Sequence, residues 1–260
     1  MINLMNAAKE CRPMASSTSI AIALACSFGL TSVATCAAAP RLLPGVSPSV
    51  RPSAEPFGLF AFPLSDSPLK QKWLALGHEL AVDRVQLALC ESDRTGCASL
   101  SAVEFLAIID IARQRAGRAR LGEVNRSVNL AIRPASDLAQ YGEVDAWKSP
   151  LTTFLRGAGD CEDYAIAKYV ALRESGESPS NLRIVIVRDD ISGEDHALTA
   201  ARVEGQRWLI LDNRRMTIIE DTHTRNYQPL FVFNETGIWK YENTPALGAA
   251  RRPGWDVFSK

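Results

Sequence analysis

The apolar residues in the N-terminal half of the chain recur at helical spacing. Three helices are predicted there, over residues 69–89, 101–116 and 121–131. Ser101 is the candidate N-cap of the second helix, because Glu104 follows three residues later in the pattern of a capping box. The apolar positions that define the first two helices are Trp73, Leu76, Leu80, Leu87, Phe105, Ile108, Ile109 and Ala112.

The pattern changes in the second half of the chain. A fourth helix is predicted over residues 161–173, with Gly176 as a suitable C-terminal stop. Runs of β-branched and apolar residues, bounded by turn residues, then predict strands over residues 182–187, 197–203, 208–211 and 230–234. Helices followed by an antiparallel sheet indicate an α+β domain.

The first forty residues differ in composition from the rest. Lys9 and Arg12 precede an apolar run of small residues from about Ile20 to Ala34, and small residues continue up to Pro40. This order predicts a secretory signal peptide over residues 1–39, and therefore a periplasmic protein. The apolar run is too short and too interrupted to span a bilayer comfortably. The alternative is an amphipathic or disordered N-terminus that is not an export signal.

The remaining chain is predicted to contain one domain with two extensions. Residues 40–68 are rich in proline and serine and are predicted to form an extended lead, residues 69–243 the domain, and residues 244–260 a C-terminal tail. The 29 basic and 29 acidic residues of the chain balance. The chain therefore has no net positive charge that would favour nucleic acid or an anionic membrane as a partner. No transmembrane segment is expected in the mature chain.

Three of the six cysteines lie beyond residue 39. An odd number in an exported protein suggests one disulfide and one free thiol. Cys90 and Cys97 flank turn-forming residues and can close a small loop in an oxidising compartment. Cys161 is then the free thiol. The alternative is three unpaired thiols.

Cys161 lies at the start of the fourth predicted helix, among the acidic residues Asp160, Glu162 and Asp163. The helix dipole and the free N–H groups of a helix start favour a thiolate. The flanking carboxylates oppose a thiolate, because like charges disfavour one another. A bound cation would resolve this contradiction.

A catalytic cysteine needs a base and a group that orients the base. Of the three histidines, His196 opens a predicted strand, and Asp212 ends the next one. A three-residue loop at residues 203–205 would place His196 directly opposite Asp212, whereas a two-residue turn would place them on opposite faces. We predict the three-residue loop or an equivalent bulge. Taken singly, each residue also has a purely structural interpretation.

The most specific segment of the chain is GAGDCEDYAIAKY at residues 157–169. It stands with residues 128–133, 141–147, 182–185, His196, residues 211–213 and residues 233–239. In these segments the chain resembles the bacterial transglutaminase-like cysteine proteinases, the group that contains the LapG-type periplasmic proteases.

This resemblance implies a papain-like, transglutaminase-type core with its nucleophile at a helix N-terminus. It implies Cys161 as nucleophile, His196 as general base and Asp212 as the orienting group. It also implies a calcium ion held by Asp160 and Glu162, with Asp163 as a further ligand, and carboxylate oxygens suit Ca²⁺. The alternative is that Asp160 caps the helix and Glu162 interacts with its dipole.

For the subfamily of known proteases, the resemblance implies a large surface adhesin as substrate, release of biofilm cells, and an inner-membrane receptor as regulator. Two other functions use the same residues differently. One is transglutaminase-type acyl transfer to an amine. The other is a non-catalytic, calcium-stabilised periplasmic binding module.

Overall fold

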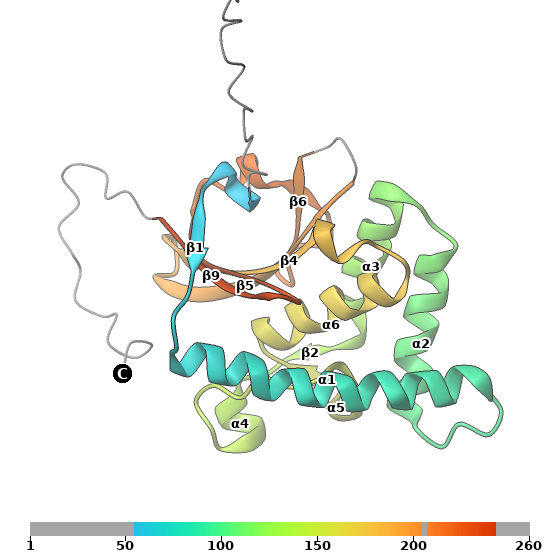
Figure 1. Ribbon diagram of the computed structural model, residues 1–260. Coiled ribbons are helices and arrows are strands. Elements are labelled where there is room, and N and C mark those ends of the chain that lie inside the picture. Colours follow the sequence, from blue (N-terminus) through green and yellow to red (C-terminus); the bar gives the residue numbers. More distant parts are fainter. Residues whose placement is uncertain (1–54, 204–206, 243–260) are drawn as a thin grey trace, which may run out of the picture. The chain divides into compact units, whose positions relative to one another are not determined.

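The computed structural model describes residues 55–203 and 207–242, and it confirms an α+β architecture (Figure 1). Its centre is a seven-stranded antiparallel sheet with the order β1-β9-β8-β4-β5-β6-β7. The strands are β1 (Ala61–Pro63), β4 (Leu182–Asp189), β5 (Glu194–Arg202), β6 (Trp208–Leu211), β7 (Ile219–Glu220), β8 (Tyr227–Asn234) and β9 (Gly237–Tyr241). The predicted signal peptide and C-terminal tail lie outside the described residues.

Helices gather on one face of this sheet (Figure 1). They are α1 (Pro68–Ser92), α2 (Leu100–Arg113), α3 (Gly117–Ala131), α4 (Asp137–Tyr141), α5 (Pro150–Arg156) and α6 (Cys161–Glu174). Two short strands, β2 (Arg133–Pro134) and β3 (Ala158–Gly159), pair in parallel and join the segment after α3 to the segment before α6. No helix within the described ranges is long and apolar enough to cross a membrane.

Helix α6 is the central element of the helical layer. Its residues from Asp163 to Leu172 are all buried, because α6 packs on β4 and β5 on one side and on α2, α3 and α5 on the other. A helix that is covered all round needs no polar face. The Thr199 hydroxyl donates to the Ala165 carbonyl oxygen (2.8 Å), which ties β5 to α6. This packing fixes the position of Cys161 relative to β5.

Two details differ from the sequence prediction. Ser99, rather than Ser101, caps α2 by accepting a hydrogen bond from the Ala102 N–H, and Ser101 is a buried residue of the first turn. The sheet also begins upstream of residue 69, because β1 pairs with β9. The Glu55 carboxylate and the Arg183 guanidinium join this upstream segment to β4. Part of the predicted lead therefore belongs to the fold.

The disulfide between Cys90 and Cys97 is present, as predicted. The loop between them turns at Asp93, whose carboxylate accepts hydrogen bonds from the Gly96 N–H and the Thr95 hydroxyl. Cys161 is the free cysteine of the described residues.

Candidate active site

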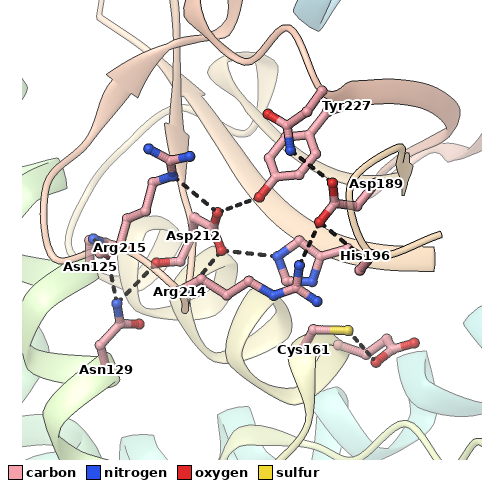
Figure 2. A network of polar contacts seen from close by, with 12 residues as sticks. Asn125, Asn129, Cys161, Asp189, His196, Asp212, Arg214, Arg215 and Tyr227 are labelled. Carbon is pink, nitrogen blue, oxygen red and sulfur yellow. Dashed lines mark hydrogen bonds and ion pairs between the residues drawn. The ribbon is translucent and has the colours of Figure 1, made fainter. Parts of the chain in front are cut away.

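His196 and Asp212 form a buried pair between β5 and the end of β6 (Figure 2). His196 Nε2 lies 2.9 Å from Asp212 Oδ1, and each residue is only 1% exposed. Because an ionised carboxylate can only accept, the proton of this hydrogen bond belongs to Nε2. His196 Nδ1 is buried and has no hydrogen-bond partner among the described residues. The imidazole is therefore held in the tautomer whose Nδ1 lone pair can accept a proton.

The register between β5 and β6 differs from the predicted hairpin. Arg202 pairs with Trp208 and Thr199 with Leu211, so residues 203–207 connect the strands instead of a three-residue loop. Residues 204–206 of this connection lie outside the described residues. The observed register brings the Arg202 guanidinium to 4.9 Å from the centroid of the Trp208 ring, a favourable cation–π contact.

The prediction that His196 and Asp212 share one face is nevertheless confirmed. The register is displaced by two residues, and side chains alternate between faces with a period of two. The two residues are therefore diagonal neighbours instead of directly opposed ones. Diagonal pairs remain within reach of long or aromatic side chains.

The Asp212 carboxylate is surrounded by donors. Tyr227 donates its hydroxyl to Oδ2 (2.8 Å), the Arg214 N–H donates to Oδ1 (2.9 Å), and Arg215 Nε lies 3.8 Å from Oδ2. Burial alone would raise the pKa of Asp212, but the hydrogen bond and charge of His196 and the other donors lower it to about 2. Asp212 is therefore ionised at neutral pH. Sequence reasoning missed Tyr227, because a tyrosine at a strand start is usually a packing residue.

Cys161 is the first residue of α6, as predicted, and its thiol lies beside β5. The pairing of β5 with β6 stops at Thr199, so β6 does not cover Ala197, whose backbone acts to lower the pKa of the Cys161 thiol against the larger effect of burial. The thiol itself donates to Glu162 Oε2 (3.0 Å). Burial and then the charge of Glu162 raise the pKa of Cys161. Figure 2 shows the sulfur on the side of the imidazole away from Asp212.

Three carboxylates converge beside the N-terminus of α6. Oxygen atoms of Asp137, Asp160 and Asp163 all lie within 4.8 Å of one another. One oxygen of each carboxylate is buried without a hydrogen-bond partner among the described residues. Burial, followed by the neighbouring negative charges, raises the pKa of Asp160 to about 10, and mainly burial raises that of Asp163 to about 7. Such a set of unpaired oxygens fits a divalent cation.

Backbone pairing brings these carboxylates together. Pro134 of β2 pairs with Gly159 of β3, so Asp137 at the start of α4 approaches Asp160. A Cβ atom on Gly159 would lie 2.7 Å from Asp163 Cβ, so a glycine is required for the close approach. Asp137 was missed, because nothing in the sequence spacing relates it to Cys161, and only its position as a helix-start aspartate is visible there.

The predicted ligands are therefore divided between two positions. Asp160 and Asp163 belong to the carboxylate cluster, together with Asp137. The Glu162 carboxylate instead accepts a hydrogen bond from the thiol, and its charge, after burial, raises the pKa of Asp160. Glu162 thereby connects the cluster to Cys161.

A helix N-terminal cysteine packed against an antiparallel sheet defines a papain-like, transglutaminase-type α+β core. The family profile of the bacterial transglutaminase-like cysteine proteinases matches residues 85–239, and the chain belongs to this family. It is a transglutaminase-like cysteine protease and acts on protein.

Solved structures agree with this assignment. The chain is 26% identical to Legionella pneumophila LapG, with a TM-score of 0.51, covering 61% of this chain and 87% of that one. A calcium-bound structure of Legionella pneumophila LapG is 24% identical over 66% of this chain and 91% of that one, with the same TM-score of 0.51. No curated protein sequence matches the chain significantly.

Proposed function

We propose that this protein is an exported, calcium-dependent cysteine endopeptidase with Cys161 as nucleophile, His196 as general base and Asp212 as the orienting group. The observation that carries the proposal is the state of His196. Its Nε2–H is engaged by Asp212, and its buried Nδ1 has no partner among the described residues. A histidine in this state is arranged to take a proton from a neighbouring thiol.

The proposed reaction is peptide-bond hydrolysis. His196 Nδ1 takes the proton of Cys161 Sγ, and the thiolate attacks the carbonyl carbon of the scissile bond. The C–N bond then breaks, the leaving amine takes the proton from Nδ1, and an acyl-thioester remains. Water, deprotonated by His196, releases the acyl group and restores the thiol. The amide groups at the N-terminus of α6, including that of Cys161, have no intrahelical partners and would stabilise the oxyanion.

In the proposed enzyme, Asp137, Asp160 and Asp163 would hold calcium. The bound ion would supply positive charge that offsets the carboxylates beside the thiol. The fit rests on the three unpaired buried oxygens of these residues. The calcium-bound structure of Legionella pneumophila LapG supports the choice of metal by analogy.

The proposed substrate is a protein of the cell envelope, with a large biofilm adhesin as the leading candidate and an inner-membrane receptor as regulator. Three observations support this location and substrate: the signal-peptide pattern of residues 1–39, the Cys90–Cys97 disulfide, and the similarity to LapG. Disulfides form and persist in oxidising compartments such as the periplasm.

The experiment compares envelope proteins from cells that produce the parent protein or the Cys161→Ala variant. Protein N-termini would be labelled and identified by mass spectrometry. We expect at least one new N-terminus that depends on Cys161 and that does not form when the substrate is incubated with the periplasmic extract in EGTA. Identical N-terminal profiles for the two proteins would refute the proposed protease function in the envelope.

A further inference from the structure

Helix α3 contacts the turn that carries Asp212, although none of its residues touches the thiol or the imidazole in the contacts described above. We propose that Asn129, supported by Asn125, is a positioning residue that holds the Asp212–Arg215 turn and thereby orients the Asp212 carboxylate. This inference rests on the proposed function, since it assigns a role in aligning the same triad.

The contacts of Asn129 are unusual in joining both ends of the turn. Asn129 Nδ2 donates to the Asp212 carbonyl oxygen (3.0 Å) and to the Arg215 carbonyl oxygen (3.0 Å). Asn125, one helical turn earlier on α3, donates to the same Arg215 carbonyl oxygen (2.8 Å). An asparagine amide has two N–H donors, and Asn129 uses one for each end of the turn. Figure 2 shows both asparagines on the side of the turn away from His196.

The geometry of this turn determines how the Asp212 carboxylate is held. The Arg215 N–H donates to the Asp212 carbonyl oxygen (3.3 Å), which closes the turn, and the Arg214 N–H then points at Asp212 Oδ1 (2.9 Å). The same Oδ1 accepts from His196 Nε2. Displacement of the turn would therefore move the carboxylate that fixes the tautomer of His196.

The opposite side of the turn has a separate anchor. The Arg214 guanidinium donates to Asp189 Oδ2 (2.8 Å), and Asp189 is buried at the end of β4, where Asn226 also donates to it. The turn is thus held from the sheet as well as from α3. Loss of the α3 contacts should loosen the turn without releasing it, because the Asp189 anchor and the Tyr227 hydrogen bond remain.

The two asparagines should differ in what they contribute. Asn125 is completely buried, and within the described part of the chain its side chain hydrogen-bonds to the far end of the turn and not to Asp212, so its removal should mainly lower stability. Asn129 is only partly buried and contacts Asp212 itself. Its removal should mainly affect the alignment of Asp212.

The experiment uses the full chain with the substitution Asn129→Leu, which keeps the side-chain size but removes both donors. Ser127→Ala is the matched control, because Ser127 lies on the same helix and bonds only Glu123 among the described residues. Nitrogen-15 NMR of the histidine rings would report the tautomer of His196. Peptide mass spectrometry would report the rate at which iodoacetamide labels Cys161.

In the parent and in Ser127→Ala we expect His196 to be protonated at Nε2. In Asn129→Leu we expect a mixture of tautomers and labelling slower by about 10-fold, the scale at which orienting partners act. A merely structural role would shift the melting temperature and leave the tautomer unchanged. If Asn129→Leu does not fold, Asn129→Ser is measured in its place with the same expectation.

This inference alone would be overturned if the parent behaves as expected but the folded Asn129 variant has the same His196 tautomer and the same labelling rate as the parent. The proposed function, and this inference with it, would be overturned by two results in the parent protein. These are that iodoacetamide fails to label Cys161, and that His196 is not protonated at Nε2. The two failures are therefore distinguishable.

Discussion

The Cys161 thiol lies 3.0 Å from Glu162 Oε2, and the charge of Glu162 also acts on Asp160, whose pKa it raises after the larger effect of burial. The proposed nucleophile is thus joined through one side chain to the carboxylate cluster. The negative charge of Glu162 opposes the thiolate, since it contributes, after burial, to the raised pKa of Cys161. Charge at the proposed metal site and reactivity of the thiol should therefore depend on each other.

Removing the charge of Glu162 tests this connection directly. In EGTA at pH 7.5, we expect Glu162→Gln to react with iodoacetamide at Cys161 several-fold faster than the parent, because the thiolate loses a repulsive neighbour. The rate is measured by mass spectrometry of the labelled peptide. Glu174→Gln, at the other end of α6, is the matched control and should behave as the parent does. A slower or equal rate in Glu162→Gln would contradict the electrostatic role.

The hydroxyl of Tyr227 should contribute to both stability and reactivity. Tyr227→Phe removes the donor to Asp212 Oδ2 and should lower the free energy of unfolding by about 1–2 kcal/mol. Labelling of Cys161 should slow several-fold, because Asp212 holds His196 less firmly. Tyr241→Phe is a close control, since the Tyr241 hydroxyl is also buried but has no hydrogen-bond partner among the described residues. Equal urea midpoints for the two variants would count against the role of Tyr227.

The stability of the calcium-free protein should depend on pH through Asp163. Its folded pKa of about 7 lies above the usual aspartate value of about 3.9, so the folded state binds more protons between these two pH values. This group's contribution to stability is therefore complete below about pH 4 and is lost as the pH rises toward 7, by at most about 1.4 kcal/mol per pH unit. The raised pKa of Asp160 acts in the same direction.

Comparison with Asp163→Asn isolates this effect, because asparagine stays neutral. In EGTA, the melting temperature of the parent relative to Asp163→Asn should fall as the pH rises from 5 to 7. Saturating calcium should reduce or reverse the fall, because the cation prefers ionised carboxylates. A difference that stays constant with pH in EGTA would show that Asp163 is not protonated in the folded state.

Asp137 should be needed for calcium binding although it lies far from Cys161 in the sequence. We expect Asp137→Asn to weaken calcium binding by at least about 10-fold in titration calorimetry and to reduce the calcium-induced rise in melting temperature. Asp145→Asn is the control, since Asp145 pairs with Lys72 outside the carboxylate cluster. Unchanged affinity in Asp137→Asn would remove this residue from the site.

Much of the fold follows from local patterns. The four predicted helices correspond to α1, α2, α3 and α6, and the four predicted strands to β4, β5, β6 and β8, because each has a long periodic or β-branched pattern. Short elements such as β2, β3 and α4 were not predicted. Two-residue strands and a five-residue helix have too little pattern of their own and depend on tertiary pairing.

The same division applies to the site. Cys161, His196 and Asp212 could be singled out because each stands at the end of a predicted element, where side chains converge. Asp137, Tyr227 and Asn129 could not, since their positions depend on the β2–β3 pairing, the β4–β8 pairing and the packing of α3 on the Asp212 turn. The register of β5 with β6 was not predicted, because the turn residues alone do not show that Arg202 pairs with Trp208.

The activation of Cys161 by His196 and Asp212 is tested most directly by the rate at which iodoacetamide labels Cys161 at pH 7.5 in saturating calcium. The proteins compared are the parent, His196→Ala, Asp212→Asn and the control Asp195→Asn. Asp195 neighbours His196 on β5 but pairs with Arg188. We expect rapid labelling of Cys161 in the parent and in Asp195→Asn, and labelling slower by about 10-fold or more in the other two variants. Equal rates in all four proteins would contradict the assignment of Cys161 as a nucleophile activated by His196 and Asp212.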